Sequence, residues 1–262
     1  MKRGRQRGQV TIFIIIAIVI VASIAVFLSF REGIIGPQIG ESTEENPAGF
    51  LETCMRDKIT EVIDILYSRG GSVSNPLNKT FQFDEDIFPT DISYLCYTGS
   101  YFIPCTNQET MLIQTIKDEI KNYVSNDAKN CFDKLTASLN NEGFVVDARY
   151  DGINVDMMDG KVIINFDAEL ALTKSGETTK QTEFNVVRLS RLYDSATVAQ
   201  EISSQEAKYC NFEYVGYMLL YPQWNIDKLR TSDSSIIYSI KHQDDEDKFR
   251  FAVRGCVIRP GL

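Results

Sequence analysis

The six cysteines are the residues of this chain whose chemistry is easiest to anticipate. An even number of cysteines outside the cytoplasm generally forms disulfides, whereas a metal site needs closely spaced ligands. The chain has no Cys-x-x-Cys pair, and its only histidine, His242, is distant in sequence, so the spacing does not favour a zinc site. The cysteines are Cys54, Cys96, Cys105, Cys131, Cys210 and Cys256. We therefore expect disulfides and no metal.

The positions of the cysteines favour one set of pairs, although the sequence alone leaves other pairings open. One pair encloses a short loop that contains Gly99 and Pro104 and can bend back on itself. A second pair joins two predicted helical segments, and a third connects the end of a predicted third helix to the last strand. The predicted bonds are Cys54–Cys131, Cys96–Cys105 and Cys210–Cys256.

Residues suited to catalysis are present but do not form a recognisable constellation. A Ser–His triad would have to use His242, which lies beside the acidic run Asp244–Asp247. Carboxylate pairs for acid–base work could come from Asp84–Asp86 or from Asp167 and Glu169, but 36 acidic residues make such neighbours common. Gly-x-Ser-x-Gly, His-Glu-x-x-His and phosphate-binding glycine motifs are absent from the sequence. We expect a protein without catalytic activity and without a cofactor.

Four aromatic residues gather around the predicted Cys96–Cys105 loop. Rigid aromatic side chains on a disulfide-closed loop make effective contact surfaces, because they lose little conformational freedom on binding. The alternative is that this loop packs against its own sheet. The residues are Tyr94, Tyr97, Tyr101 and Phe102. They form the candidate binding surface.

One glycosylation sequon, Asn78-Lys79-Thr80, lies in a polar stretch of the chain. A sequon is modified only where it is exposed in a compartment that attaches glycans. Asn78 is therefore a candidate modification site if this part of the chain lies outside the cell.

Residues 10–30 decide the predicted location. This apolar run from Val10 to Phe30 contains no charged residue, and as a helix it would be about 31 Å long, enough to cross a bilayer. Four basic residues and no acidic residue occur in residues 1–9, so the positive-inside rule places that segment in the cytoplasm and the rest of the chain outside. A buried core helix or a cleavable secretory signal would explain so long a run less well.

The rest of the chain is strongly acidic. Residues 31–262 hold 23 basic residues (27 less the four at the N-terminus) against 36 acidic ones, a net charge of −13. Binding to nucleic acid depends largely on lysine and arginine displacing counterions, so this balance argues against a nucleic-acid partner. The expected partners are the lipid bilayer and other envelope proteins or copies of this chain.

The segment Arg7-Gly8-Gln9-Val10-Thr11-Ile12-Phe13 resembles the leader of archaeal type IV pilin-like proteins. The resemblance implies cleavage between Gly8 and Gln9 by a prepilin-type peptidase, with the apolar helix retained. The pilin pattern has glutamate where this chain has Phe13, which argues against filament assembly. The chain also resembles an uncharacterised group of archaeal membrane-anchored proteins, through this opening, the helix bearing Cys54 and the turn at Gly70-Gly71.

The remaining pattern predicts a linker over residues 31–47 and one α+β domain over residues 48–262. Helices are expected over 47–66, after a capping box at Thr106–Glu109 with a phase break near 125–126, and over 189–208. Residues 72–105 are expected to be irregular. Alternation around a turn at Asp159-Gly160, a second turn at Ser175-Gly176 and two final strands, 235–240 and 249–257, predict an antiparallel sheet.

The sequence therefore predicts a single-pass membrane-anchored envelope protein. Its disulfide-stapled extracytoplasmic domain is expected to have two or three helices, an antiparallel sheet and a binding or structural role. A pilin-like filament subunit is the first alternative, and cleavage after Gly8 would favour it. A membrane-tethered hydrolase is the second alternative, and it would require a deep pocket with convergent polar groups.

Overall fold

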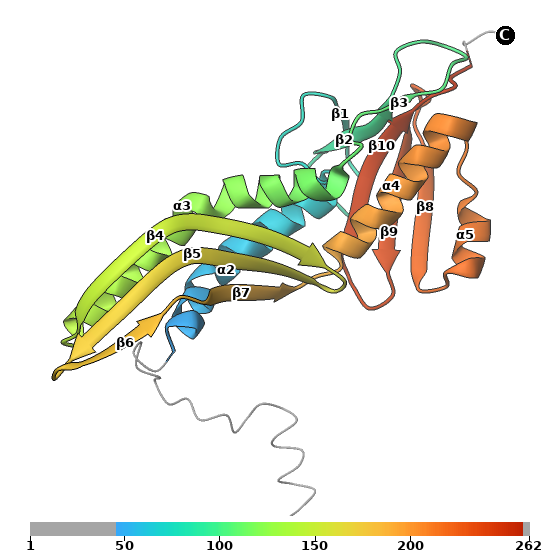
Figure 1. Ribbon diagram of the computed structural model, residues 1–262. Helices are drawn as coiled ribbons and strands as arrows, with labels where there is room; N and C mark the ends of the chain where they lie inside the picture. Colours follow the sequence, from blue (N-terminus) through green and yellow to red (C-terminus); the bar gives the residue numbers. More distant parts are fainter. Residues whose placement is uncertain (1–45, 259–262) are drawn as a thin grey trace, which may run out of the picture. The chain divides into compact units, whose positions relative to one another are not determined.

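The computed structural model describes residues 46–258, which form one compact unit with four helices and ten strands in two sheets (Figure 1). The helices are α2 Pro47–Ser68, α3 Leu112–Asn141, α4 Leu192–Tyr209 and α5 Tyr214–Leu220. The strands are β1 Asn78–Phe81, β2 Thr90–Tyr97, β3 Thr106–Asn107, β4 Val145–Met158, β5 Lys161–Lys174, β6 Glu177–Gln181, β7 Phe184–Leu189, β8 Trp224–Arg230, β9 Ile236–His242 and β10 Lys248–Arg254.

None of the helices within residues 46–258 has the length and apolar character needed to cross a membrane. The predicted membrane segment at 10–30, the basic segment 1–9 and the cleavage point at Gly8 and Gln9 lie outside the described residues, as does the linker up to residue 45. The α+β class and the disulfides of the predicted domain are confirmed.

Helix α2 begins and ends where local sequence signals place it. The side chain of Asn46 accepts a hydrogen bond from Gly49 N at 2.7 Å, and Pro47 occupies the first turn, where its missing N–H is no loss. Gly70 and Gly71 follow the helix with φ of 72° and 87°, a left-handed conformation that glycine adopts readily. One apolar stripe of this helix is buried: Leu51, Met55, Ile59, Val62, Ile63 and Leu66.

Helix α3 corrects the expected start of the second helix and confirms its continuation past residues 125–126 with a shifted apolar stripe. The capping box at Thr106–Glu109 is wrong, because Thr106 and Asn107 form strand β3 against β2, and the helix begins at Leu112 with no side-chain cap. The helix also continues through residues 125–126 to Asn141. From Leu112 to Ala128 every fourth residue is buried, so the buried stripe moves gradually around a helix that has 3.6 residues per turn. A step of three residues, from Ala128 to Cys131, brings the stripe back to the same face.

One sheet is built on the predicted hairpin. Strands β4 and β5 pair from Met158↔Lys161 to Val145↔Thr173, and alternate residues of β5 face the core. On its other edge β5 pairs first with β7 and then with β6, both antiparallel. Helix α3 packs on this sheet, and α2 packs on both α3 and β7. Alternation with a period of two therefore predicted this sheet correctly.

Gly160 gives a direct test of the hairpin turn. Its φ of 72° is left-handed, so we expect Gly160→Val to lower the free energy of unfolding by about 1–2 kcal/mol through backbone strain. Gly99→Val is the matched control, because Gly99 has no positive φ and no atom within 4 Å of its Cβ position. Denaturant unfolding of both variants would measure the effect, and equal losses would show that β-branching, and not φ, is responsible.

The second sheet was predicted only in part. Its strand order is β1-β2-β10-β9-β8, and the short β3 pairs with Cys96 and Tyr97 at the end of β2. Strand β2 runs parallel to β10, while the other pairs are antiparallel. The sequence predicted one antiparallel sheet, whereas the structure has two sheets, of which the second is mixed. The irregular structure expected over 72–105 is wrong, because β1 and β2 lie there. Five consecutive residues of β2, Ile92 to Cys96, are buried, so this strand carries no alternation to read. Strand β8 and helix α5 were also not predicted.

Both faces of the second sheet are covered. One face packs against α4 and α2 in the main core. The other face carries a small cluster of Ile92, Tyr94, Ile237 and Ala252, and Leu77, Phe81, Phe83 and Tyr97 pack over it. We call this second face the outer face of the sheet. It carries the candidate site.

Candidate functional site

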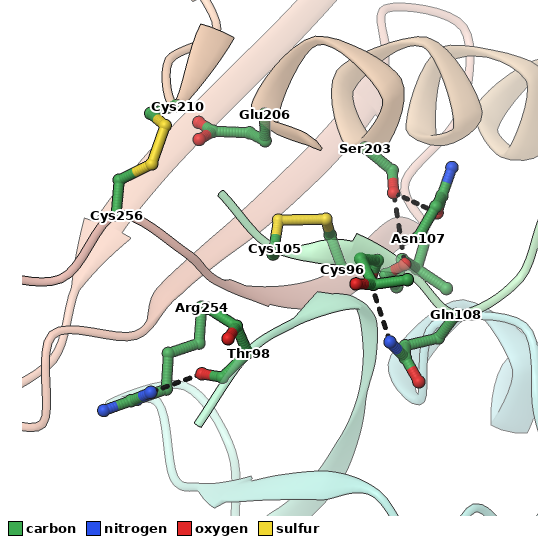
Figure 2. Close-up of a disulfide and its surroundings, with 12 residues drawn as sticks. Cys96, Thr98, Cys105, Asn107, Gln108, Ser203, Glu206, Cys210, Arg254 and Cys256 are labelled. Atoms are coloured by element: carbon green, nitrogen blue, oxygen red, sulfur yellow. Dashed lines mark hydrogen bonds between the residues drawn. A yellow bond between two sulfur atoms is a disulfide. The ribbon is translucent and has the colours of Figure 1, made fainter. Parts of the chain in front are cut away.

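All six cysteines are paired, in the three pairs favoured by the sequence. The Cα–Cα distances are 5.9 Å for Cys54–Cys131, 5.4 Å for Cys96–Cys105 and 5.8 Å for Cys210–Cys256, within the range of protein disulfides. The first bond joins α2 to α3. The second closes the loop between β2 and β3, and the third links the end of α4 to the chain after β10 (Figure 2).

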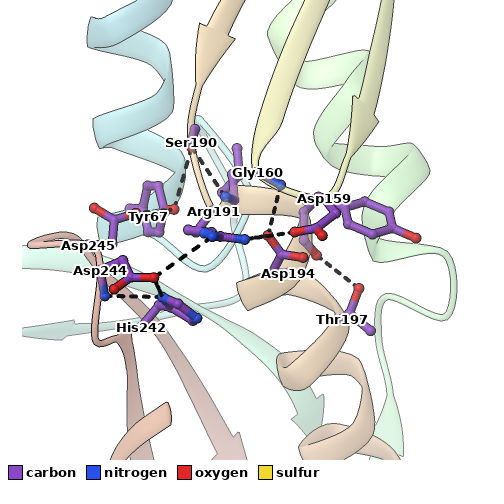
Figure 3. A network of polar contacts seen from close by, with 12 residues as sticks. Tyr67, Asp159, Gly160, Ser190, Arg191, Asp194, Thr197, His242, Asp244 and Asp245 are labelled. Atoms are coloured by element: carbon purple, nitrogen blue, oxygen red, sulfur yellow. Dashed lines mark hydrogen bonds and ion pairs between the residues drawn. The ribbon is translucent and has the colours of Figure 1, made fainter. Parts of the chain in front are cut away.

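His242 belongs to a polar network that joins three segments of the chain (Figure 3). The Arg191 guanidinium lies 2.7 Å from Asp159 Oδ1 in the β4–β5 turn, 3.7 Å from Asp194 and 3.9 Å from Asp244 in the β9–β10 loop. His242 Nδ1 accepts a hydrogen bond from Asp244 N at 3.2 Å, and its ring contacts Trp224 edge-on. The network thereby links both sheets to the start of α4.

Three of the acidic residues singled out in the sequence, Glu85, Asp86 and Glu169, have cationic partners. Glu85 and Asp86 lie 2.6 Å and 2.8 Å from the two terminal nitrogens of Arg250, whose guanidinium also stacks over Phe83. A hydrogen bond from Lys248 lowers the pKa of Glu85 below its usual range. The other pair, on β5, is exposed. In this pair, Glu169 Oε2 lies 3.2 Å from Lys180 Nζ.

A cleft of about 510 Å³ opens on the outer face of the second sheet. It lies between β1, β2, the last residue of β10 and the turn between β8 and β9. Its lining residues are Pro76, Leu77, Asn78, Lys79, Thr80, Tyr94, Tyr97, Gly99, Asp233 and Arg254. Two members of the predicted aromatic surface and the sequon asparagine thus line a single cleft.

Hydrogen bonds hold most of the polar groups of this cleft. Lys79 Nζ lies 2.8 Å from Asp233 Oδ2, Tyr94 Oη lies 2.8 Å from Ser235 Oγ, and Asn78 Nδ2 donates to Asn75 O at 2.7 Å. Burial favours protonation of Asp233, but hydrogen bonds from Lys79, Thr231 and Ser235 outweigh it, so the pKa of this carboxyl lies well below its usual range. Burial raises the pKa of Tyr94. The walls of the cleft are therefore preorganised.

Arg254 is the exception among the charged groups of the cleft. Its Nη1 donates to the carbonyl oxygen of Thr98, as Figure 2 shows, and its guanidinium carbon lies 6.0 Å from the ring centroids of both Tyr97 and Tyr101. Among the described residues, no carboxylate lies within 4.0 Å of its guanidinium nitrogens. A guanidinium has five N–H donors, so most of them remain available to a ligand.

The four predicted aromatic residues are thus divided. Tyr94 is buried, Tyr97 is half-buried, and both line the cleft. Tyr101 flanks Arg254 from outside the lining, and Phe102 is 58% exposed at the tip of the Cys96–Cys105 loop. Tyr94 packs within the sheet, whereas Phe102 projects outward from the loop. The role of the four residues as a contact surface stays a prediction.

Sequence reasoning missed the charged residues of the cleft, namely Lys79, Asp233 and Arg254. A signal for the last of these exists, because Arg250, Ala252 and Arg254 alternate along one strand and therefore lie on one face. No comparable signal brings Asp233 to Lys79, which is far away in the sequence.

Comparison of the chain with protein-family models, curated proteins and solved structures finds no match.

Proposed function

We propose that this chain is a single-pass membrane-anchored protein of the cell envelope, whose domain outside the membrane binds a ligand or partner and does not catalyse a reaction. The observation that carries the proposal is the set of three disulfides within residues 46–258, downstream of the apolar run at 10–30. Disulfides persist in oxidising compartments, and a span of that length with basic residues before it directs the C-terminal part of the chain across the membrane.

The binding role is supported by the cleft on the outer face. Its polar groups are held in place by hydrogen bonds, and a small set of fixed polar groups beside aromatic rings is typical of ligand sites. Arg254 offers unused donors there. In contrast, His242, Glu85, Asp86 and Glu169 have structural partners of their own.

Two alternatives make different predictions. A pilin-like subunit would lack residues 1–8 in the mature protein, and would form filaments through its apolar helix. A membrane-tethered hydrolase would turn over a substrate in the cleft, with Asp233 as its only carboxylate. The low pKa of Asp233 disfavours it as a general acid, because an acid catalyst needs a pKa near the working pH.

Labelling of single engineered cysteines tests the topology. Ser42→Cys adds a thiol beyond the apolar run, and Gln6→Cys adds one before it. A membrane-impermeant maleimide on intact cells is expected to label Ser42→Cys, and to label Gln6→Cys only after permeabilisation. The reverse pattern, or labelling of neither before permeabilisation, would refute the proposal.

Mass determination of the purified protein before and after reduction separates the alternatives. Three disulfides add about six mass units on reduction, and loss of residues 1–8 would identify cleavage after Gly8 and favour the pilin-like subunit. The wild-type mass with six free thiols would remove the main support for an oxidising compartment.

A further inference from the structure

Two arginines on the same face of β10 have contrasting surroundings. Arg250 is buried, and the chain itself supplies Glu85 and Asp86 as carboxylate partners and Phe83 as a stacking ring. Arg254, four residues further along, has two tyrosine rings at 6.0 Å but, within residues 46–258, no carboxylate partner. Both arginines therefore lie near aromatic rings, but only Arg250 has carboxylate partners.

The other charges of the cleft limit the ligand. Lys79 is neutralised by Asp233, so the cleft has one positive charge available, that of Arg254. Asp233 also disfavours a polyanion, since a second negative group would approach a carboxylate. These charges match a ligand with a single carboxylate, which a guanidinium can hold through two parallel hydrogen bonds.

The remaining lining indicates what carries that carboxylate. Asn78, Lys79 and Asp233 present amide, ammonium and carboxylate groups that exchange hydrogen bonds with hydroxyls. Tyr97 adds an aromatic ring that can pack against the C–H face of a sugar, and Tyr97 Oη has no hydrogen-bond partner among the described residues. A volume of about 510 Å³ lies within the range of small-ligand sites.

We propose that this cleft binds an acidic saccharide, with Arg254 holding the carboxylate of a uronic-acid unit and Tyr97 packing against its ring. This inference rests on the proposed binding role and adds the chemical class of the ligand. The lysine–aspartate pair fixes the hydroxyls of the sugar. Recognition then depends on both the carboxylate and the hydroxyls.

The test uses the full chain in detergent, made in a bacterial host without N-glycosylation, so that no glycan on Asn78 occupies the cleft. Digalacturonate is titrated by calorimetry, beside digalactose as the uncharged counterpart. We expect saturable binding of digalacturonate that weakens with salt, and at least tenfold weaker binding of digalactose. No binding of digalacturonate, or equal binding of both sugars, would overturn the proposal.

Variants assign the contacts. Arg254→Gln is expected to weaken digalacturonate binding at least tenfold, and Arg254→Lys is expected to give an intermediate affinity, because it keeps the charge and loses the fork. Tyr97→Ala should also weaken binding, while Tyr97→Phe should retain most of it. Arg149→Gln is the matched control, since Arg149 forms an exposed pair with Asp151 outside the cleft.

Two further measurements keep the outcome decisive. Arg254 also binds the Thr98 carbonyl, so its replacement could unfold the domain, and thermal unfolding of Arg254→Gln shows whether the variant is folded. If it is not folded, the affinity of Arg254→Lys for digalacturonate tests the contact instead. Equal affinity for a short peptide carboxylate would overturn the saccharide assignment. Failure of binding together with the expected cysteine labelling would reject the ligand while leaving the membrane topology intact.

Discussion

Replacing both Cys54 and Cys131 with alanine is expected to lower the free energy of unfolding by about 4 kcal/mol. This disulfide closes a loop with a sequence separation of 77 residues, the largest of the three. In the chain-entropy account, the bond restricts the unfolded chain, and the effect grows with the logarithm of the loop length. The bond also fixes α2 to α3, the two helices that pack beneath the first sheet.

The fluorescence of Trp224 gives a convenient measurement. It is the only tryptophan of the chain and is buried in the folded domain, so denaturant unfolding of the full chain can be followed without signal from the apolar run. The control is the double replacement of Cys96 and Cys105, whose separation is 9 residues and whose predicted loss is about 2.5 kcal/mol. Equal losses from the two double variants would contradict the loop-length argument.

Glu206→Ala is expected to cost about 3–5 kcal/mol of folding free energy, the range for breaking a buried charge pair. The side chain of Glu206 is only 4% exposed. Its Oε1 accepts hydrogen bonds from Lys228 Nζ and Phe212 N, both at 3.2 Å, and from the Tyr238 hydroxyl. Removing the carboxylate leaves the Phe212 amide and the Tyr238 phenol without this acceptor in the interior, and leaves Asn211 as the remaining acceptor for the Lys228 ammonium.

Two variants show whether burial is the cause. Glu201→Ala changes an exposed acid on the same helix and is expected to alter stability by no more than about 0.5 kcal/mol. Combining Glu206→Gln with Lys228→Met removes both charges and should recover much of the loss. A loss below about 1 kcal/mol for Glu206→Ala would mean that water replaces the carboxylate around Lys228.

The fold could be predicted for segments in which the apolar pattern arises from burial of a single face. The helix at 47–68 has caps and a single apolar stripe, and β5 alternates cleanly because one of its faces is wet. Strand β2 gave no such signal, because the second sheet is covered on both sides and five consecutive residues are buried. Thr106 misled because a residue type that caps helices also suits a short edge strand.

The sequence singles out some of the residues that line the cleft. It does not show that they come together, or which charged residues join them. Tyr94, Tyr97 and Asn78 stand out in the sequence as aromatic or sequon residues. Arg254 joins them only because β10 lies parallel to β2, with Arg254 opposite Tyr97. Pairing between strands so far apart in the sequence is a tertiary event, and local patterns carry no information about it.

The distribution of the disulfides has a consequence for damage to the chain. Two bonds lie within residues 54–131 and the third within 210–256, and no bond crosses from one group to the other. A protease cut between β1 and β2 would leave the fragments covalently joined through Cys54–Cys131. A cut at the exposed turn Ser175–Gly176 would leave two pieces held together only by packing and hydrogen bonds, which would separate on a non-reducing denaturing gel. Any single cut between Cys131 and Cys210 has this effect, and the exposed β5–β6 turn is one such place.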